Sequence, residues 1–90
     1  MNNNEILAYF LENLWTKGFK LTDEEVHFIY FGMKYTNTTV IQVKIALSLT
    51  LQLQFNFDRS FYISLLELFK TNHIQSMKEA RLLLQKKHLI

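Results

Sequence analysis

Residues 41–57 read IQVKIALSLTLQLQFNF, and the conformation of this stretch decides the fold. All nine odd-numbered positions are apolar and seven of the eight even-numbered ones are polar, Ala46 being the exception. Such alternation is typical of a half-buried β-strand. A straight strand of this length would nevertheless be about 56 Å long. A chain of 90 residues has a radius of gyration of only roughly 12 Å, so such a strand does not fit.

A hairpin across this stretch would need a turn, and Leu47-Ser48-Leu49 contains no glycine, asparagine or aspartate to make one. A helix over residues 39–55, capped by Thr38 or Thr39, would be about 26 Å long and does fit. Its odd-numbered positions would then be spread around the whole circumference. We therefore expect a buried central helix, and the alternative is a shorter strand within residues 41–57 that pairs across a dimer.

Two helices are expected before this stretch, over residues 5–17 and 22–35. Gly18 suits the left-handed position that ends the first helix, and Thr22 with Glu25 forms a capping-box pattern that begins the second. The second helix has two apolar sides, one with Ile29 and Met33 and the other with Phe28, Phe31 and Tyr35. We expect one side to meet the core and the other to meet a further element or another molecule.

Two more helices are expected after it, over residues 58–70 and 76–88. Asp58 can cap the first of these, and Ser76 with Glu79 forms a second capping-box pattern. The sequence therefore predicts an all-α fold: a compact bundle of four to five helices that forms a single helical domain over residues 1–90. The apolar arcs exceed what so short a chain can bury by itself, which favours an oligomer.

Charge is distributed unevenly along the chain, although its formal net charge is only +2. Residues 1–25 carry five acids against two lysines, whereas residues 59–90 carry six bases against two acids. The basic residues of the last expected helix are therefore candidates for contact with phosphates or an acidic partner, namely Lys78, Arg81, Lys86 and Lys87. The alternative is a solvated face whose charge suits the helix dipole.

The composition indicates a cytoplasmic protein that does not span a membrane. The chain has no cysteine, so an oxidising compartment offers it no disulfide. Its N-terminus lacks the pattern of a secretory signal. The longest uncharged apolar-rich run, residues 45–57, is too short and too polar to cross a bilayer.

We expect no enzymatic activity, no metal and no cofactor. The three histidines, His27, His73 and His88, are far apart in sequence and lack metal-ligand spacing. The two glycines are isolated, so no phosphate-binding loop is visible. No serine has the surroundings of a nucleophile elbow.

The alternative strand carries a polar face at Gln52, Gln54 and Asn56, and two expected helices follow it. This order resembles ribbon-helix-helix repressors, in which strands from a dimer read bases in the major groove. The resemblance covers the C-terminal part of the chain and implies base contacts by these three side chains. Against it, the strand face has no arginine or lysine, and two helices precede it.

Our prediction for function is a small non-enzymatic interaction protein, such as a regulator, adaptor or inhibitor. It would act through apolar helical surfaces on itself, as a homo-oligomer, or on another protein. The candidate interface residues are Trp15, Phe28, Phe31 and Tyr35, although Trp15 also suits the core. The alternative is a dimeric DNA-binding transcriptional regulator of the ribbon-helix-helix type. No small-molecule ligand is inferred.

Overall fold

The computed structural model describes residues 2–90, which form five helices and no strand. The helices are α1 (Asn3–Thr16), α2 (Asp23–Thr36), α3 (Val40–Gln54), α4 (Arg59–Thr71) and α5 (Met77–Lys86). Each expected helix has its counterpart, with ends shifted slightly. The predicted all-α class and the helical bundle are therefore confirmed.

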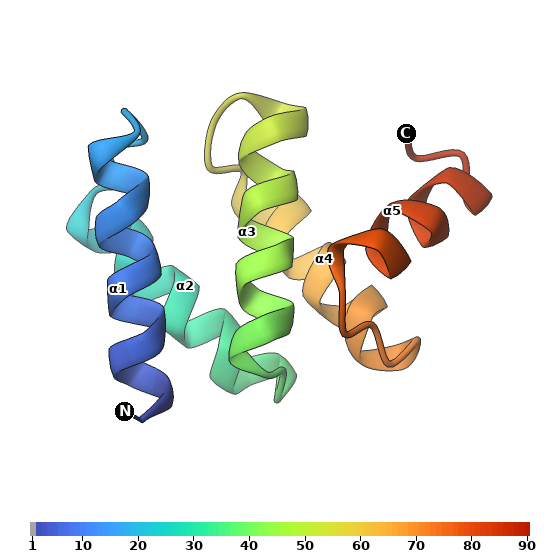
Figure 1. Cartoon of the computed structure of the whole chain (residues 1–90), viewed down its shortest axis with the longest axis horizontal. Coiled ribbons are helices and arrows are strands. Elements are labelled where there is room, and N and C mark those ends of the chain that lie inside the picture. The colour runs from blue at the N-terminus through green and yellow to red at the C-terminus, as the bar shows by residue number, and fades with distance from the viewer. Residues whose placement is uncertain (1) are drawn as a thin grey trace.

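Helix α3 lies at the centre of the molecule (Figure 1). It packs against α1 on one side and against α2 and α4 on the other. Helix α5 lies beside α4, at the end of the molecule opposite α1. The radius of gyration is 12.3 Å, close to the value expected for a folded chain of this length.

The alternative of a strand within residues 41–57 is wrong, because residues 40–54 are helical. Neighbouring helices surround α3, so apolar side chains can be buried on nearly all of its sides. Val43, Ala46 and Leu47 are completely buried. Only a narrow strip remains open to solvent, in which Ile41 and Gln52 are exposed while Lys44 and Ser48 are half-buried.

The even-numbered polar residues of α3 form two separate stripes with helical spacing. Lys44, Ser48 and Gln52 follow the open strip at four-residue intervals. Gln42 and Thr50 are instead buried and form internal hydrogen bonds. Thr50 Oγ1 donates to the Ala46 carbonyl at 2.7 Å. The polar positions of the alternating sequence therefore form two helical stripes, one open to solvent and one buried.

Gln42 connects α3 to the C-terminal part of the chain. Its Nε2 donates to the carbonyls of Phe69 and Ile74, each at 3.1 Å. Its Oε1 accepts from the Thr39 amide at 3.0 Å, while the Gln42 amide donates to Thr39 Oγ1. This capping box begins α3 at Thr39, one of the two caps that the sequence predicts. A single buried amide therefore fixes the start of α3 and the α4–α5 connection.

The other predicted helix ends are set by local side chains. Thr22 and Glu25 form the expected capping box, and Asp58 accepts from the Phe61 amide. Gly18 has a φ of 97° after α1, as predicted. Ser76 caps α5, but the Glu79 carboxylate accepts from the amide of Gln75 instead of that of Ser76. The predicted second capping box is therefore wrong in its return bond.

Helices α2 and α4 cross at unusually close range. A Cβ atom at Gly32 would lie 2.8 Å from Tyr62 Cε2 and 3.0 Å from Ile63 Cδ1. The Tyr62 hydroxyl donates to the Ile29 carbonyl at 2.8 Å. Burial raises the pKa of the Tyr62 phenol well above its usual range, so it keeps this proton at neutral pH. Helix α2 is thus held firmly on its inner side.

Candidate interaction surface

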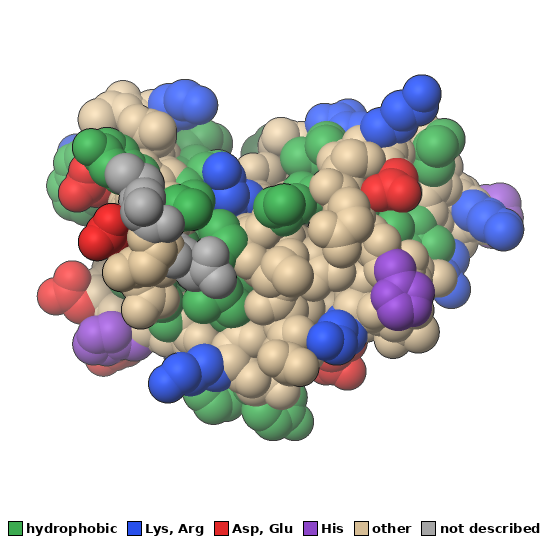
Figure 2. All heavy atoms as spheres, turned by 60° about the horizontal axis from the view of Figure 1, so that its bottom comes forward, with side chains coloured by type: hydrophobic (Ala, Val, Ile, Leu, Met, Phe, Trp, Pro, Cys, Tyr) green, Lys and Arg blue, Asp and Glu red, His purple; other side chains and the backbone are tan. Residues whose placement is uncertain are grey.

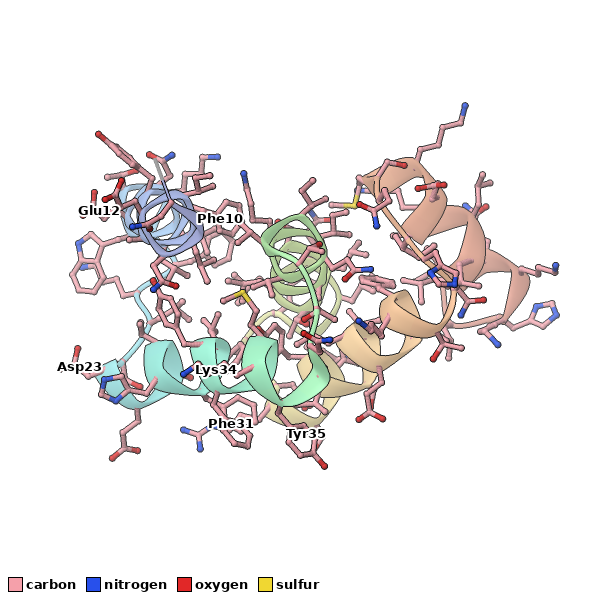
Figure 3. All side chains as sticks on the ribbon, turned by 90° about the horizontal axis from the view of Figure 1, so that it is seen from below. Phe10, Glu12, Asp23, Phe31, Lys34 and Tyr35 are labelled. Atoms are coloured by element: carbon pink, nitrogen blue, oxygen red, sulfur yellow. The ribbon has the colours of Figure 1, made fainter. Side chains whose placement is uncertain are left out.

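The side of α2 that faces away from the core carries a row of aromatic side chains. Phe31 is 53% exposed and Tyr35 is 69% exposed, while Phe28 is half-buried. Figure 3 shows Phe31 and Tyr35 projecting from α2 away from the rest of the molecule. We call this surface the outer α2 face and define it by the residues that share this side of the helix: Asp23, Glu24, His27, Phe28, Phe31, Lys34 and Tyr35.

The aromatic rings of the outer α2 face follow one another along the helix. The Phe31 and Tyr35 ring centroids are 5.5 Å apart with an interplanar angle of 17°. Phe28 and Phe31 are 5.7 Å apart and tilted. Residues three and four apart on a helix are neighbours, which explains why this spacing brings the rings together. The result is a continuous aromatic ridge.

Phe28 joins this ridge to the core. Its ring lies 6.1 Å from that of Phe57 and 6.3 Å from that of Tyr62. The Arg59 guanidinium lies 5.2 Å from the centre of the Phe28 ring on the solvent side. With its base fixed in this way, the ridge loses little conformational entropy when a partner binds.

Two shallow hollows flank the ridge on the α4 side. One, of about 500 Å³, is lined by Phe28, Arg59, Ser60, Ile63 and Ser64. The other, of about 420 Å³, is lined by Tyr35, Thr36, Glu67, Lys70 and Thr71. Such concave margins can receive the side chains of a partner that lies across the aromatic ridge. The chemistry of the lining is mixed polar and apolar, as in the rim of many protein interfaces.

The predicted interface residues do not form one surface. Phe28, Phe31 and Tyr35 are brought together, whereas Trp15 lies at the end of α1. It is 55% exposed, and its ring lies 5.6 Å from Lys20 Nζ. The interpretation of Trp15 as a core residue is therefore wrong, because the chain turns at Gly18 before another element covers it.

The four basic residues of the C-terminal helix point in different directions from α5. Arg81 Nη2 donates to Gln52 Oε1 at 3.2 Å, toward the end of α3. Lys87 lines a hollow with Glu67 of α4, and Lys78 and Lys86 are exposed. Acids predominate around α1 and the start of α2, and bases around α5 (Figure 2). The charge separation is thus real in space, but these bases do not converge on one point.

The ribbon required by the alternative DNA-binding prediction is not formed. Gln52 and Gln54 lie on helix α3, and Asn56 lies in the bend after it. Asn56 Nδ2 donates to the Gln54 carbonyl at 3.0 Å, so these residues fold on one another locally. Helix α3 is also the central helix, packed against α1, α2 and α4, so that only a narrow strip of it is open to solvent.

Two further features of the described part of the chain bear on the type of site. Within residues 2–90, no group of three or more His, Cys, Asp or Glu side chains is placed to hold a metal ion. None of the helices described is long and apolar enough to cross a membrane.

Phe55 is the most exposed of the aromatic residues that sequence reasoning missed. Phe55 caps the end of α3 in the left-handed conformation, with a φ of 61°, and its ring is 89% exposed. A phenylalanine in this conformation is uncommon. The alternation of the sequence suggested a buried position, and only the end of the helix at Gln54 reveals that the ring points outward.

The fold and its surface define a small all-helical protein that presents a firmly held aromatic helix face to its surroundings. The chain belongs to a family of unknown function (DUF6123), whose family model matches residues 1–90. No curated protein matches the sequence, and no solved structure matches it.

Proposed function

We propose that this protein is a small non-enzymatic interaction protein that binds protein through the outer α2 face. A regulator, an adaptor or an inhibitor fits this description, and the partner is either a second copy or another protein. The observation that carries the proposal is the aromatic ridge of Phe28, Phe31 and Tyr35, which is exposed at one end and anchored to the core at the other. A cytoplasmic location is part of the proposal.

Burial of this ridge supplies the driving force for binding. Aromatic side chains dominate the energetics of many interfaces, because they bury a large area with few rotatable bonds. Phe31 and Tyr35 contribute little to the core in their exposed positions. Their exposed position on an ordered helix therefore suits contact with another molecule better than a role in the stability of the chain.

Site-specific photocrosslinking in cells tests the proposal. A photoreactive phenylalanine analogue is placed at position 31 and, in a second variant, at position 82. Leu82 of α5 is a matched control because its 55% exposure is close to the 53% of Phe31. We expect protein adducts from position 31 that are absent from position 82.

A Phe31→Ser variant sharpens the result when the crosslinker is moved to position 35. Adducts from position 35 should decrease at least about fivefold in this background, and Leu82→Ser should leave them unchanged. Equal labelling from positions 31 and 82 would contradict the proposed function.

A further inference from the structure

The charges of the outer α2 face have an order that is complementary to itself. Asp23 and Glu24 lie at the first turn, Lys34 lies in the last turn, and the aromatic ridge lies between them. Asp23 and Lys34 are eleven positions apart, which corresponds to about 16 Å along a helix. When such a helix is turned end for end, each charge meets its opposite.

We propose that the outer α2 face binds the same face of a second copy of this chain, with the two α2 helices antiparallel across a two-fold axis. Lys34 of each copy then lies opposite Asp23 and Glu24 of the other. This inference rests on the proposed function, because it assigns a partner to the same surface. Its interface is isologous, so every favourable contact occurs twice.

The charge pairing also fixes the register of the aromatic residues. With Lys34 opposite Asp23 and Glu24, the two-fold axis passes close to Phe28. Phe31 of one copy then lies over a space surrounded by four residues of the other at positions i, i+3, i+4 and i+7: Glu24, His27, Phe28 and Phe31. This is the arrangement of a knob in a hole between packed helices.

A register with Phe31 directly opposite Phe31 is less favourable. It would place Lys34 opposite the apolar ring of Phe28 and leave Glu24 beyond the end of the other helix. The acids and the base would then lose their partners while being partly desolvated, which is costly. Charge and packing therefore select the same register.

A dimer of this kind needs only a small part of the surface of each copy. A specific interface buries about 600 to 800 Å² on each partner, which is roughly a tenth of the 5900 Å² surface of one copy. The ridge supplies the apolar centre, and the hollows beside α4 supply a polar margin. In the view of Figure 3, α2 is the outermost helix on this side. The exposed Arg59 side chain over Phe28 would have to move aside or lie at the margin of the interface.

Sedimentation equilibrium of charge-swapped variants tests the proposal. We expect the wild-type chain, of 10.8 kDa, to dimerise reversibly over roughly 1 to 500 µM. Glu24→Lys alone and Lys34→Glu alone should each weaken self-association at least about tenfold, because two attractive pairs become repulsive. Phe31→Ser should abolish it over the same range.

Mixing the two charge variants provides the decisive measurement. A Glu24→Lys chain and a Lys34→Glu chain are complementary to each other across the proposed axis, so their mixture should form heterodimers within about threefold of the wild-type affinity. Both variants carry an unfavourable charge for the α2 dipole, and circular dichroism checks that each remains helical. Restoration by mixing cannot come from repair of folding, because neither chain is altered by mixing. Lys78→Glu on α5 is the control and should leave dimerisation unchanged.

Two results would overturn the dimer. One is a wild-type chain that stays monomeric at the highest concentration, and the other is a dimer that resists both charge swaps and Phe31→Ser. If position 31 still crosslinks to a different protein in either case, the proposed function stands and only the identity of the partner is wrong. If position 31 crosslinks to nothing, both fail.

Discussion

Helices α2 and α3 are both rich in apolar residues, yet their surroundings in the fold differ. Helix α3 is packed against α1, α2 and α4, and it buries apolar side chains around almost its whole circumference. Helix α2 has α3 and α4 on its inner side, and its second apolar side is open. The difference shows that the number of neighbouring elements, and not apolar content alone, decides whether a second apolar face becomes core or an exposed surface.

The largest contrast between the two helices should appear when one large side chain is truncated in each. Leu47 of α3 is completely buried, so Leu47→Ala should lower the free energy of unfolding by about 2 to 5 kcal/mol. Phe31→Ala on α2 should change it by less than about 0.5 kcal/mol in the monomer, because the ring is exposed. Urea unfolding at low protein concentration measures both. Similar losses of stability in the two variants would contradict the difference in burial between the two helices.

The two glutamines of α3 provide the next test. Gln42→Leu leaves the buried Phe69 and Ile74 carbonyls without the Nε2 donor, and it should cost about 1 to 3 kcal/mol. Gln52→Leu, on the open strip of the same helix, is the matched control and should cost less than about 0.5 kcal/mol. Hydrogen exchange should also show earlier opening of the α4–α5 connection in the Gln42 variant only.

The inner side of α2 should resist even one added methyl group. Gly32→Ala gains about 1 kcal/mol of helix propensity, but its Cβ would crowd Tyr62 and Ile63, so we expect a net loss of about 1 to 2 kcal/mol. In a double-mutant cycle, Ile63→Ala should recover part of the loss by removing one of the crowded atoms. A net gain in thermal stability would show that α2 and α4 can separate easily.

Because of the hydrogen bond that anchors α2 to α4, the free energy of unfolding should depend on pH in the alkaline range. The pKa of Tyr62 is raised in the folded chain above the value of about 10 in the unfolded chain. The stability linked to this proton is therefore fully present below about pH 10 and is lost as the pH rises further. Tyr62→Phe should cost about 1 kcal/mol at pH 7, and the difference from wild type should shrink and then reverse above pH 10. Parallel stability curves for the two proteins would contradict this.

The smallest expected effect is a gain at the end of α3. Phe55 adopts a left-handed conformation with an exposed ring, so Phe55→Gly should raise the free energy of unfolding by about 0.5 to 1 kcal/mol. Asn37 has a similar φ of 55° after α2. Asparagine tolerates this conformation better, so Asn37→Gly should give a smaller gain. Thermal unfolding compares the two, and a loss on Phe55→Gly would show that the ring supports the fold.

Much of the fold was accessible from local signals. The caps at Thr22, Asp58 and Ser76 locate the starts of three helices, because each side chain satisfies an amide within its own first turn. The two-sided pattern of α2 also predicted a second apolar side with Phe31 and Tyr35, which the structure leaves exposed. These features depend on residues three or four positions apart, which is the range over which sequence directly reports helix geometry.

Other parts of the candidate surface could not be predicted in this way. Trp15 shares the apolar arc of α1 but has no helix above it, and the bases of α5 diverge because they lie at different angles around one short helix. Phe55 continues an apolar alternation but follows the last residue of α3. Each of these outcomes depends on where a distant element packs or where a helix stops.

The sequence by itself determined four of the five helices, most helix ends and the aromatic row on α2, because backbone capping and side-chain spacing act over a few residues. Only the tertiary structure decided that residues 40–54 form a central helix, since their alternation alone also suits a strand. That helix is stable because three other helices surround it, while Gln42 and Thr50 satisfy their polar groups internally. The same packing left no element to cover the outer α2 face, which is why this face is available to a partner.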